Sequence, residues 1–316
     1  MTEAVVETRN LMATRFEVAL PGTDRVRLLA AAEQALDTVE QLEAQLSMYR
    51  PESELSGINA YAAAGPVRVE PRLFRLLWTA QEISRRTGNA FDPTVAPLLR
   101  AWGFIGGSGE AADPQALAEA RERSGLHLVE LDEVTSTVRF LREGVSLDLG
   151  AIGKGYAIDR AVEALEEAGI ASGLIHGGTS TVYGLGAPPG SEGWRVALRD
   201  PTRGPEATFG SVLLRDRALS VSAPHGKAFQ HGDRLYGHVL DPRTGEPAQA
   251  ALLAAVAHSS ATLTDALSTA LLVLGEAGLE TLAREWPDAD FLVITPGEGG
   301  VWASTAGPDP EFFRLD

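Results

Sequence analysis

Helical and strand patterns follow one another irregularly along this chain, and their order limits the folds that are open to it. Apolar residues at helical spacing predict helices over residues 24–46, 71–86, 114–125, 265–274 and 279–286. Short strand-like runs predict strands over residues 15–20, 137–141, 145–149, 172–175, 194–198, 209–214, 218–221 and 291–295. These elements show no regular βαβ alternation, so the sequence predicts an α+β fold rather than a doubly wound α/β fold.

The length of 316 residues fits one large domain or two lobes, and a hydrophobic content of 44% is enough for a core. We expect one domain over residues 11–305, with short tails at residues 1–10 and 306–316. The segment 187–193 is rich in proline and glycine. It predicts a surface loop rather than a domain boundary, because strand patterns resume on both sides.

Charge and cysteine content exclude several classes of protein. The net charge of −16 comes from 43 acidic and 27 basic residues, and no basic run could bind a nucleic-acid backbone. The chain has no cysteine, which excludes disulfides, thiolate catalysis, zinc–cysteine sites and lipid attachment to an N-terminal cysteine. The first residues do not read as a secretory signal, and no apolar stretch is long enough to span a bilayer. We therefore expect a cytoplasmic location without membrane insertion.

The segment Val145–Asp159 is the best candidate for a phosphate site. A strand pattern meets a helix pattern there across Gly150, Gly153 and Gly155, and glycines let backbone N–H groups approach a ligand. Lys154 and the helix start add positive charge. The alternative is a plain glycine-rich turn with an exposed lysine. The pattern is neither GxxxxGK[ST] nor GxGxxG, so it indicates neither a nucleoside triphosphatase nor a Rossmann dehydrogenase.

Asp265 and Thr269 are candidate ligands for a cation. They are four residues apart in a helical pattern and so share one face. A carboxylate and a hydroxyl could both reach one Mg²⁺ ion, which takes few protein oxygens together with substrate phosphates. The alternative is that Asp265 stabilises the helix start, with Thr262 or Thr264 as the cap, while Thr269 packs internally.

His238 is a candidate general base, because a histidine of near-neutral pKa can remove a proton from an attacking hydroxyl. It lies in a strand-like run that ends in a turn at Thr244 and Gly245. The histidines at positions 127, 176, 225, 231 and 258 compete with it, and spacing does not rank them.

Aromatic and acidic residues elsewhere allow two interpretations each. Tyr49 and Met12 could flank a flat ring, since aromatic faces stack and thioethers adapt to ring edges, although core packing is the commoner role. Asp92 precedes Pro93 and Thr94, a pattern that also suits a helix N-cap with proline in the first turn.

Six segments carry a shared pattern when they are taken in chain order. They are Leu11-Met12-Ala13-Thr14; Ser47-x-Tyr49 through Ser53 to Asn59; Phe91-Asp92-Pro93-Thr94 with Trp102-Gly103-Phe104; Leu147-Asp148-Leu149-Gly150-Ala151-Ile152-Gly153-Lys154-Gly155-Tyr156; His238-Val239-Leu240-Asp241-Pro242-Arg243-Thr244-Gly245; and Asp265-Ala266-Leu267-Ser268-Thr269-Ala270. Each segment is weak alone, but six in order are specific. Together they resemble the ApbE family, flavin transferases that use FAD to attach FMN to a threonine or serine of another protein.

This resemblance implies a two-lobed α+β domain of T-fold type, with the nucleotide in the cleft between the lobes. It implies an FAD site with Asp148 and Lys154 near the nucleotide and its phosphates, and Mg²⁺ held by the Ala151 carbonyl with Asp265 and Thr269. His238 would be the base. The remaining FAD-binding residues would be Met12, Tyr49, Ala90, Phe91, Asp92 and Val239. A hydroxyl of the acceptor flavoprotein, in a segment such as Asp-Gly-x-Thr/Ser-Gly, would attack the FMN-side phosphorus and release AMP.

The chain departs from the family pattern at four places. Thr179 stands where the family usually has an acidic residue after its paired glycines, and Ser222-Ala223-Pro224-His225 replaces a glycine and tyrosine-containing loop. Ala13 replaces a glycine, and Gly153 replaces a common alanine. The departures at Thr179 and Ala223 motivate one alternative, a non-catalytic FAD-binding protein. A second alternative is an FAD pyrophosphatase, in which water replaces the acceptor hydroxyl and FMN and AMP are formed.

Overall fold

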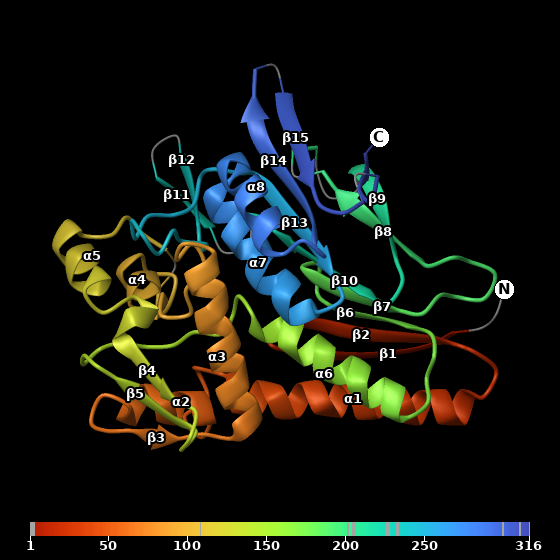
Figure 1. Cartoon of the computed structure of the whole chain (residues 1–316), viewed down its shortest axis with the longest axis horizontal. Helices are drawn as coiled ribbons and strands as arrows, with labels where there is room; N and C mark the ends of the chain where they lie inside the picture. The colour runs from red at the N-terminus through yellow and green to blue at the C-terminus, as the bar shows by residue number, and fades with distance from the viewer. Residues whose placement is uncertain are drawn as a thin grey trace.

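An eight-stranded antiparallel sheet forms the centre of the molecule (Figure 1). The structure is a computed structural model that describes residues 4–107, 109–200, 202–203, 207–224, 228–231, 234–298, 300–309 and 311–315. In spatial order the strands are β1 (Ala4–Leu11), β2 (Thr14–Pro21), β6 (Gly173–Gly177), β7 (Thr181–Leu185), β10 (Arg217–Ser222), β13 (Leu253–His258), β14 (Asp290–Gly297) and β15 (Gly300–Ala306). β13 and β14 have a strand neighbour on both edges, and the first five residues of each are buried.

Helices cover one face of this sheet. They are α1 (Arg25–Leu46), α6 (Gly153–Glu167), α7 (Ala261–Leu274) and α8 (Glu276–Glu285). α1 starts where the Asp24 side chain accepts a hydrogen bond from the N–H of Arg27, and it buries a stripe that includes Leu28, Leu36 and Val39. α7 is buried on nearly all sides because it lies between the sheet and its neighbouring helices.

A second, three-stranded sheet packs on the other face of the main sheet. Its order is β16 (Arg314–Leu315), β9 (Thr208–Leu214) and β8 (Trp194–Arg199). Leu198, Val212 and Leu214 meet Leu219 and Leu292 of the main sheet in one apolar cluster. The strand β8 is therefore held by packing across its face and by hydrogen bonds to β9 along one edge.

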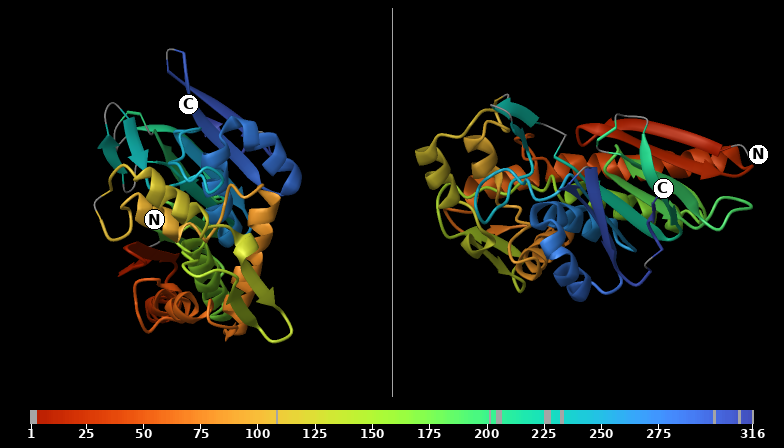
Figure 2. Two further views of the ribbon diagram at one scale, coloured as in Figure 1. Left: turned by 90° about the vertical axis from the view of Figure 1, so that its left-hand side faces the viewer. Right: turned by 90° about the horizontal axis from the view of Figure 1, so that it is seen from above.

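A smaller lobe stands beside the main sheet (Figures 1 and 2). It contains α2 (Glu54–Tyr61), α3 (Pro71–Arg86), α4 (Ala96–Ala101), α5 (Pro114–Arg121), the 3₁₀ helix Leu126–Leu128, and the strands β3 (Val67–Arg68), β5 (Thr137–Phe140) and β4 (Val129–Asp132). Buried residues of α3 share one core cluster with α7 and with strands of the main sheet. The two lobes are thus joined by a common core.

A hairpin of β11 (Ala228–His231) and β12 (Arg234–Gly237) is attached to the smaller lobe by aromatic contacts. The rings of Phe229 and Tyr236 stack with centroids 5.5 Å apart, and Tyr236 stacks on Trp102 at 5.7 Å. The Trp102 indole donates a hydrogen bond to the carbonyl of Gly245 at 2.8 Å. These contacts fix both ends of the segment that carries His238.

The predicted α+β class is confirmed, and α3 begins and ends at the predicted residues. The strand predicted over residues 145–149 is wrong. That segment is buried, but its backbone bonds to the side chain of Asn59, through both the N–H and the carbonyl of Leu147, and to the carbonyl of Pro93. The alternation of apolar residues therefore results from burial of this segment, which does not pair with a neighbouring strand.

The two predicted tails also differ from the structure. Residues 4–11 form β1, which pairs with β2 along its whole length. Near the other end, Phe312 and Phe313 are buried in the cluster beneath β8 and β9, and Arg314 pairs with Ser211. Among the residues that the structure describes, no helix is long and apolar enough to cross a membrane.

Candidate active site

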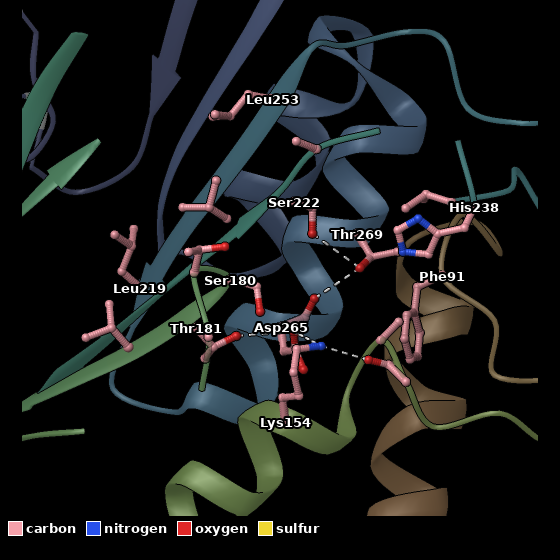
Figure 3. Close-up of a pocket in the computed structure, with 18 of the residues that line it drawn as sticks. Phe91, Lys154, Ser180, Thr181, Leu219, Ser222, His238, Leu253, Asp265 and Thr269 are labelled. Carbon is pink, nitrogen blue, oxygen red and sulfur yellow. Dashed lines mark hydrogen bonds and ion pairs between the residues drawn. The ribbon is translucent and has the colours of Figure 1, made fainter. Parts of the chain in front are cut away.

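A cavity of about 890 Å³ lies between the two lobes (Figure 3). It is lined by Phe91 of the smaller lobe, by Lys154 at the start of α6, by Asp265 and Thr269 of α7, and by His238 after the hairpin. Segments that are more than a hundred residues apart in sequence therefore meet here. Ten of the twelve predicted site residues line this cavity. They are the five residues just named together with Ala90, Asp92, Asp148, Ala151 and Val239.

The carboxylate of Asp265 connects α7 to the start of α6. Its Oδ2 accepts a hydrogen bond from the N–H of Gly155 at 3.0 Å, and its Oδ1 lies 3.8 Å from Nζ of Lys154. The residue is only 4% exposed, so its carboxylate is largely shielded from bulk water. Asp265 is not at the helix start as the alternative interpretation required, since α7 begins at Ala261 with Ser260 as its cap.

A chain of buried hydroxyls supports Asp265 from beneath. Thr181 of β7 donates to Oδ1 of Asp265 at 3.3 Å, and Ser220 of β10 donates to Thr181 at 3.2 Å. Ser220 is also 2.7 Å from the hydroxyl of Thr264, which donates to the carbonyl of Ala261. This chain of hydroxyl groups links β7 and β10 to α7 and fixes the direction of the Asp265 carboxylate.

The predicted phosphate loop has most of its backbone N–H groups in use. Gly150 donates to Oδ1 of Asp148 at 2.8 Å, Gly153 donates to the carbonyl of Leu149, and Gly155 donates to Asp265. The positive group that this segment contributes to the cavity is Lys154, whose Nζ donates to the carbonyl of Gly150 at 3.0 Å. This segment therefore offers a cation to an anionic ligand rather than a nest of free amides.

The donor atoms around Asp265 suit a magnesium ion bound together with a phosphate. Among the described residues, no three histidine, cysteine, aspartate or glutamate side chains gather to bind a metal. Here Asp265 and Thr269 line the cavity together with Ala151, whose carbonyl is the third predicted ligand. Mg²⁺ commonly takes one or two carboxylates and completes its shell with water and phosphate oxygens.

His238 lies half-buried in the wall of the cavity and follows directly after β12. The next residues form the predicted turn, in which the Arg243 guanidinium pairs with the carboxylate of Asp241 at 2.7 Å. His176 also lines the cavity, and its Nε2 is 3.5 Å from Oε1 of Glu17. The competing histidines at positions 127 and 258 are not among the lining residues, and His225 and the side chain of His231 lie outside the described part of the chain.

Phe91 and Asp92 form the wall of the smaller lobe. Asp92 does not cap a helix, because α4 starts only at Ala96. Its carboxylate accepts from the N–H and hydroxyl of Thr94, and from the N–H of Leu126 at 3.1 Å. Burial raises the pKa of Asp92, although these hydrogen bonds act in the opposite direction. The side chain thus holds the loop that presents Phe91.

Met12 and Tyr49 are the two predicted residues that do not line the cavity. Tyr49 is 66% exposed, and both partial burial and the charge of Asp148 raise its pKa. Met12 has a left-handed φ of 49°, and its N–H donates to Oε1 of Glu43 at 2.9 Å. It packs partly against the cluster beneath α1. Their proposed contact with a flavin ring stays a prediction.

Sequence reasoning predicted the Thr269 hydroxyl but did not identify the other hydroxyl groups as part of the site. Besides Thr181 and Ser220, Ser222 of β10 lines the cavity and lies 2.9 Å from Ser268 and 3.5 Å from Thr269. Thr179, one of the departures from the family pattern, also lines the cavity. The available signal was the pair of serines at alternate positions, Ser220 and Ser222, at the end of the 218–221 strand pattern.

Comparisons with known proteins agree with this geometry. A protein of Treponema pallidum named FAD:protein FMN transferase is 32% identical over 281 residues, which cover 84% of this chain and 77% of that protein. A Klebsiella pneumoniae protein of the same name is 32% identical over 281 residues, covering 87% and 85%. The crystal structure of the ApbE protein of Thermotoga maritima superposes with a TM-score of 0.89 at 27% identity, over 99% of this chain and 100% of that one. The sequence model of the ApbE family matches residues 12–293, and the chain therefore belongs to the ApbE family.

Proposed function

We propose that this protein transfers FMN from FAD to a threonine or serine hydroxyl of an acceptor flavoprotein, with Mg²⁺, and releases AMP. The observation that carries the proposal is the meeting of His238, Lys154 and the Asp265–Thr269 pair around one cavity large enough for a dinucleotide. The enzyme name that the relatives carry supports the same reaction.

In the proposed reaction, the acceptor oxygen forms a bond to the FMN-side phosphorus of FAD. The bond from that phosphorus to the bridging oxygen breaks, and AMP leaves with that oxygen. The proton of the acceptor hydroxyl passes to the imidazole of His238. A base in this position contributes on the order of 10² to 10⁴ in rate. No atom beyond FAD and the acceptor is consumed.

The remaining task of the protein is to hold an anionic pyrophosphate in line with the hydroxyl. Lys154 brings a positive charge to the cavity, and Asp265 and Thr269 would hold Mg²⁺ with the carbonyl of Ala151. When bound, Mg²⁺ neutralises charge on the pyrophosphate and on the leaving phosphate. This cation is needed because few basic side chains line this end of the cavity in a chain with a net charge of −16.

Mass spectrometry of candidate acceptor flavoproteins, after incubation with the protein, FAD and Mg²⁺, tests the proposal. We expect a covalent FMN adduct with release of AMP. The His238→Ala variant should lose the adduct and keep FAD affinity, whereas His127→Ala, an exposed histidine outside the cavity, should behave as the wild type. Repeated AMP release without any acceptor would instead identify an FAD pyrophosphatase. Tight FAD binding without AMP or adduct would identify a non-catalytic flavin-binding protein.

A further inference from the structure

The cavity extends away from His238 and Asp265 along the strand β8, and this part has no role in the reaction as described so far. Five consecutive residues, 195–199, line it. Successive side chains of a strand point to opposite faces, so a cavity that touches all five lies beside the edge of the strand. β8 pairs with β9, and in the described part of the chain it has no strand partner on its other edge.

The floor of this extension leads directly to the candidate catalytic residues. Val182 and Leu219 line the cavity and belong to the cluster that packs β8 on the main sheet. At the end of the same strands, Thr181 and Ser222 line the cavity next to Asp265 and Thr269. A ligand along β8 would therefore reach the phosphate end of the site without leaving the cavity.

We propose that the open edge of β8 binds an extended segment of the acceptor polypeptide as an added strand, which presents its hydroxyl to His238. This inference rests on the proposed function, because that function requires a polypeptide to enter the cavity. An unpaired strand edge offers alternating N–H and C=O groups, which match a polypeptide backbone and not a nucleotide. The six residues of β8 span about 20 Å, enough for a segment of similar length.

Charge favours an acceptor segment that carries a carboxylate. Arg195 and Arg199 are exposed on the same face of β8, and neither has an ion pair with any described residue. The Arg195 side chain donates a hydrogen bond to the hydroxyl of Ser211 at 3.3 Å. The protein as a whole has a net charge of −16, so these two arginines form a local positive patch that would attract an acidic polypeptide segment.

Hydrogen exchange tests the proposed strand directly. The probe is a synthetic peptide with the Asp-Gly-x-Thr-Gly pattern, added to the full-length protein with FAD and Mg²⁺. We expect backbone amides of residues 194–199 to gain protection with the peptide present and not with FAD alone. Protection of β8 by FAD alone would show that this part of the cavity binds the nucleotide and would overturn the proposal.

Charge reversal supplies the second test. The double variant Arg195→Glu/Arg199→Glu should raise the KM for the peptide by about tenfold and leave FAD affinity unchanged. Arg314→Glu is the matched control, because Arg314 is exposed on the opposite edge strand of the same three-stranded sheet. The proposed strand addition would be overturned if the KM for the peptide is unchanged in the double variant and the amides of β8 gain no protection, while FMN transfer still occurs. The proposed function would then still stand. Absence of FMN transfer by the wild type to any acceptor would instead overturn the function.

Discussion

Replacing Gly155 by alanine should separate the two helices that form the candidate metal site. A Cβ atom on Gly155 would lie 2.1 Å from the carbonyl oxygen of Ala261 and 2.8 Å from Cβ of Asp265. To restore a contact of even 3.0 Å, the backbone of α7 would have to move by roughly 1 Å, because a carbonyl cannot swing away as a flexible side chain can.

The expected cost follows from this overlap. Added carbon atoms in a tightly packed site destabilise proteins by about 1–3 kcal/mol and sometimes more. We expect the upper end of this range, because the two nearest atoms, the carbonyl oxygen and carbon of Ala261, belong to the backbone. The same movement displaces Asp265, and a misplacement of about 1 Å in an active site can lower activity by on the order of 10²-fold.

Gly153→Ala is the matched control on the same helical turn. The nearest atom to its added Cβ would be Cβ of Leu149 at 3.8 Å, an ordinary contact. Alanine is favoured over glycine in helices by up to about 1 kcal/mol, so this variant should be as stable as the wild type or slightly more stable. Urea unfolding measures both stabilities, and calorimetric titration with Mg²⁺ and FAD measures both sites. Equal stability and equal Mg²⁺ affinity of the two variants would refute the reasoning.

Three further changes have defined outcomes. Ser220→Ala interrupts the hydroxyl chain beneath Asp265, so it should lower stability by about 1–3 kcal/mol and weaken Mg²⁺ binding in calorimetry. Asn59→Ala leaves the N–H and carbonyl of Leu147 without partners, and urea unfolding should show a loss of about 2–4 kcal/mol. Burial lowers the pKa of His258, whose Nδ1 accepts the N–H of Ser260 at 3.0 Å. The folded state thus keeps the ring neutral while the unfolded chain binds a proton, so stability should fall as the pH drops below about 6.5, and less so in His258→Gln.

Much of the fold could be predicted from local periodicity, because amphipathic helices bury one stripe whatever their neighbours are. The 71–86 helix is such a case: its proline stands in the first turn, and its apolar residues recur at helical spacing. The run 145–149 shows the limit of this approach. Its apolar alternation records burial correctly, yet the hydrogen-bond partner is a side-chain amide from residue 59, which no local pattern reveals.

The candidate site divides in the same way. Residues in recognisable segments, such as Lys154 and Asp265, could be predicted because the resemblance gives their positions. Thr181 could not be predicted, since it approaches Asp265 only through the pairing of β7 with β10, which sets it opposite Ser220. Threonine and serine are common in strands. Only the register between β7 and β10 shows that Thr181 and Ser220 belong to the same buried chain of hydroxyl groups.

The start of α6 gives a physical reason for the proposed binding of a cation at this site. A helix start that follows a glycine-rich turn can bind phosphate through free backbone N–H groups. Here the N–H groups of Gly150 and Gly155 are already bonded to the carboxylates of Asp148 and Asp265. Two negative charges thus stand where an anion would otherwise bind, and Lys154 offsets only one of them. A pyrophosphate at this position requires a further positive charge, and the oxygens of Asp265 and Thr269 line the cavity where Mg²⁺ would supply it.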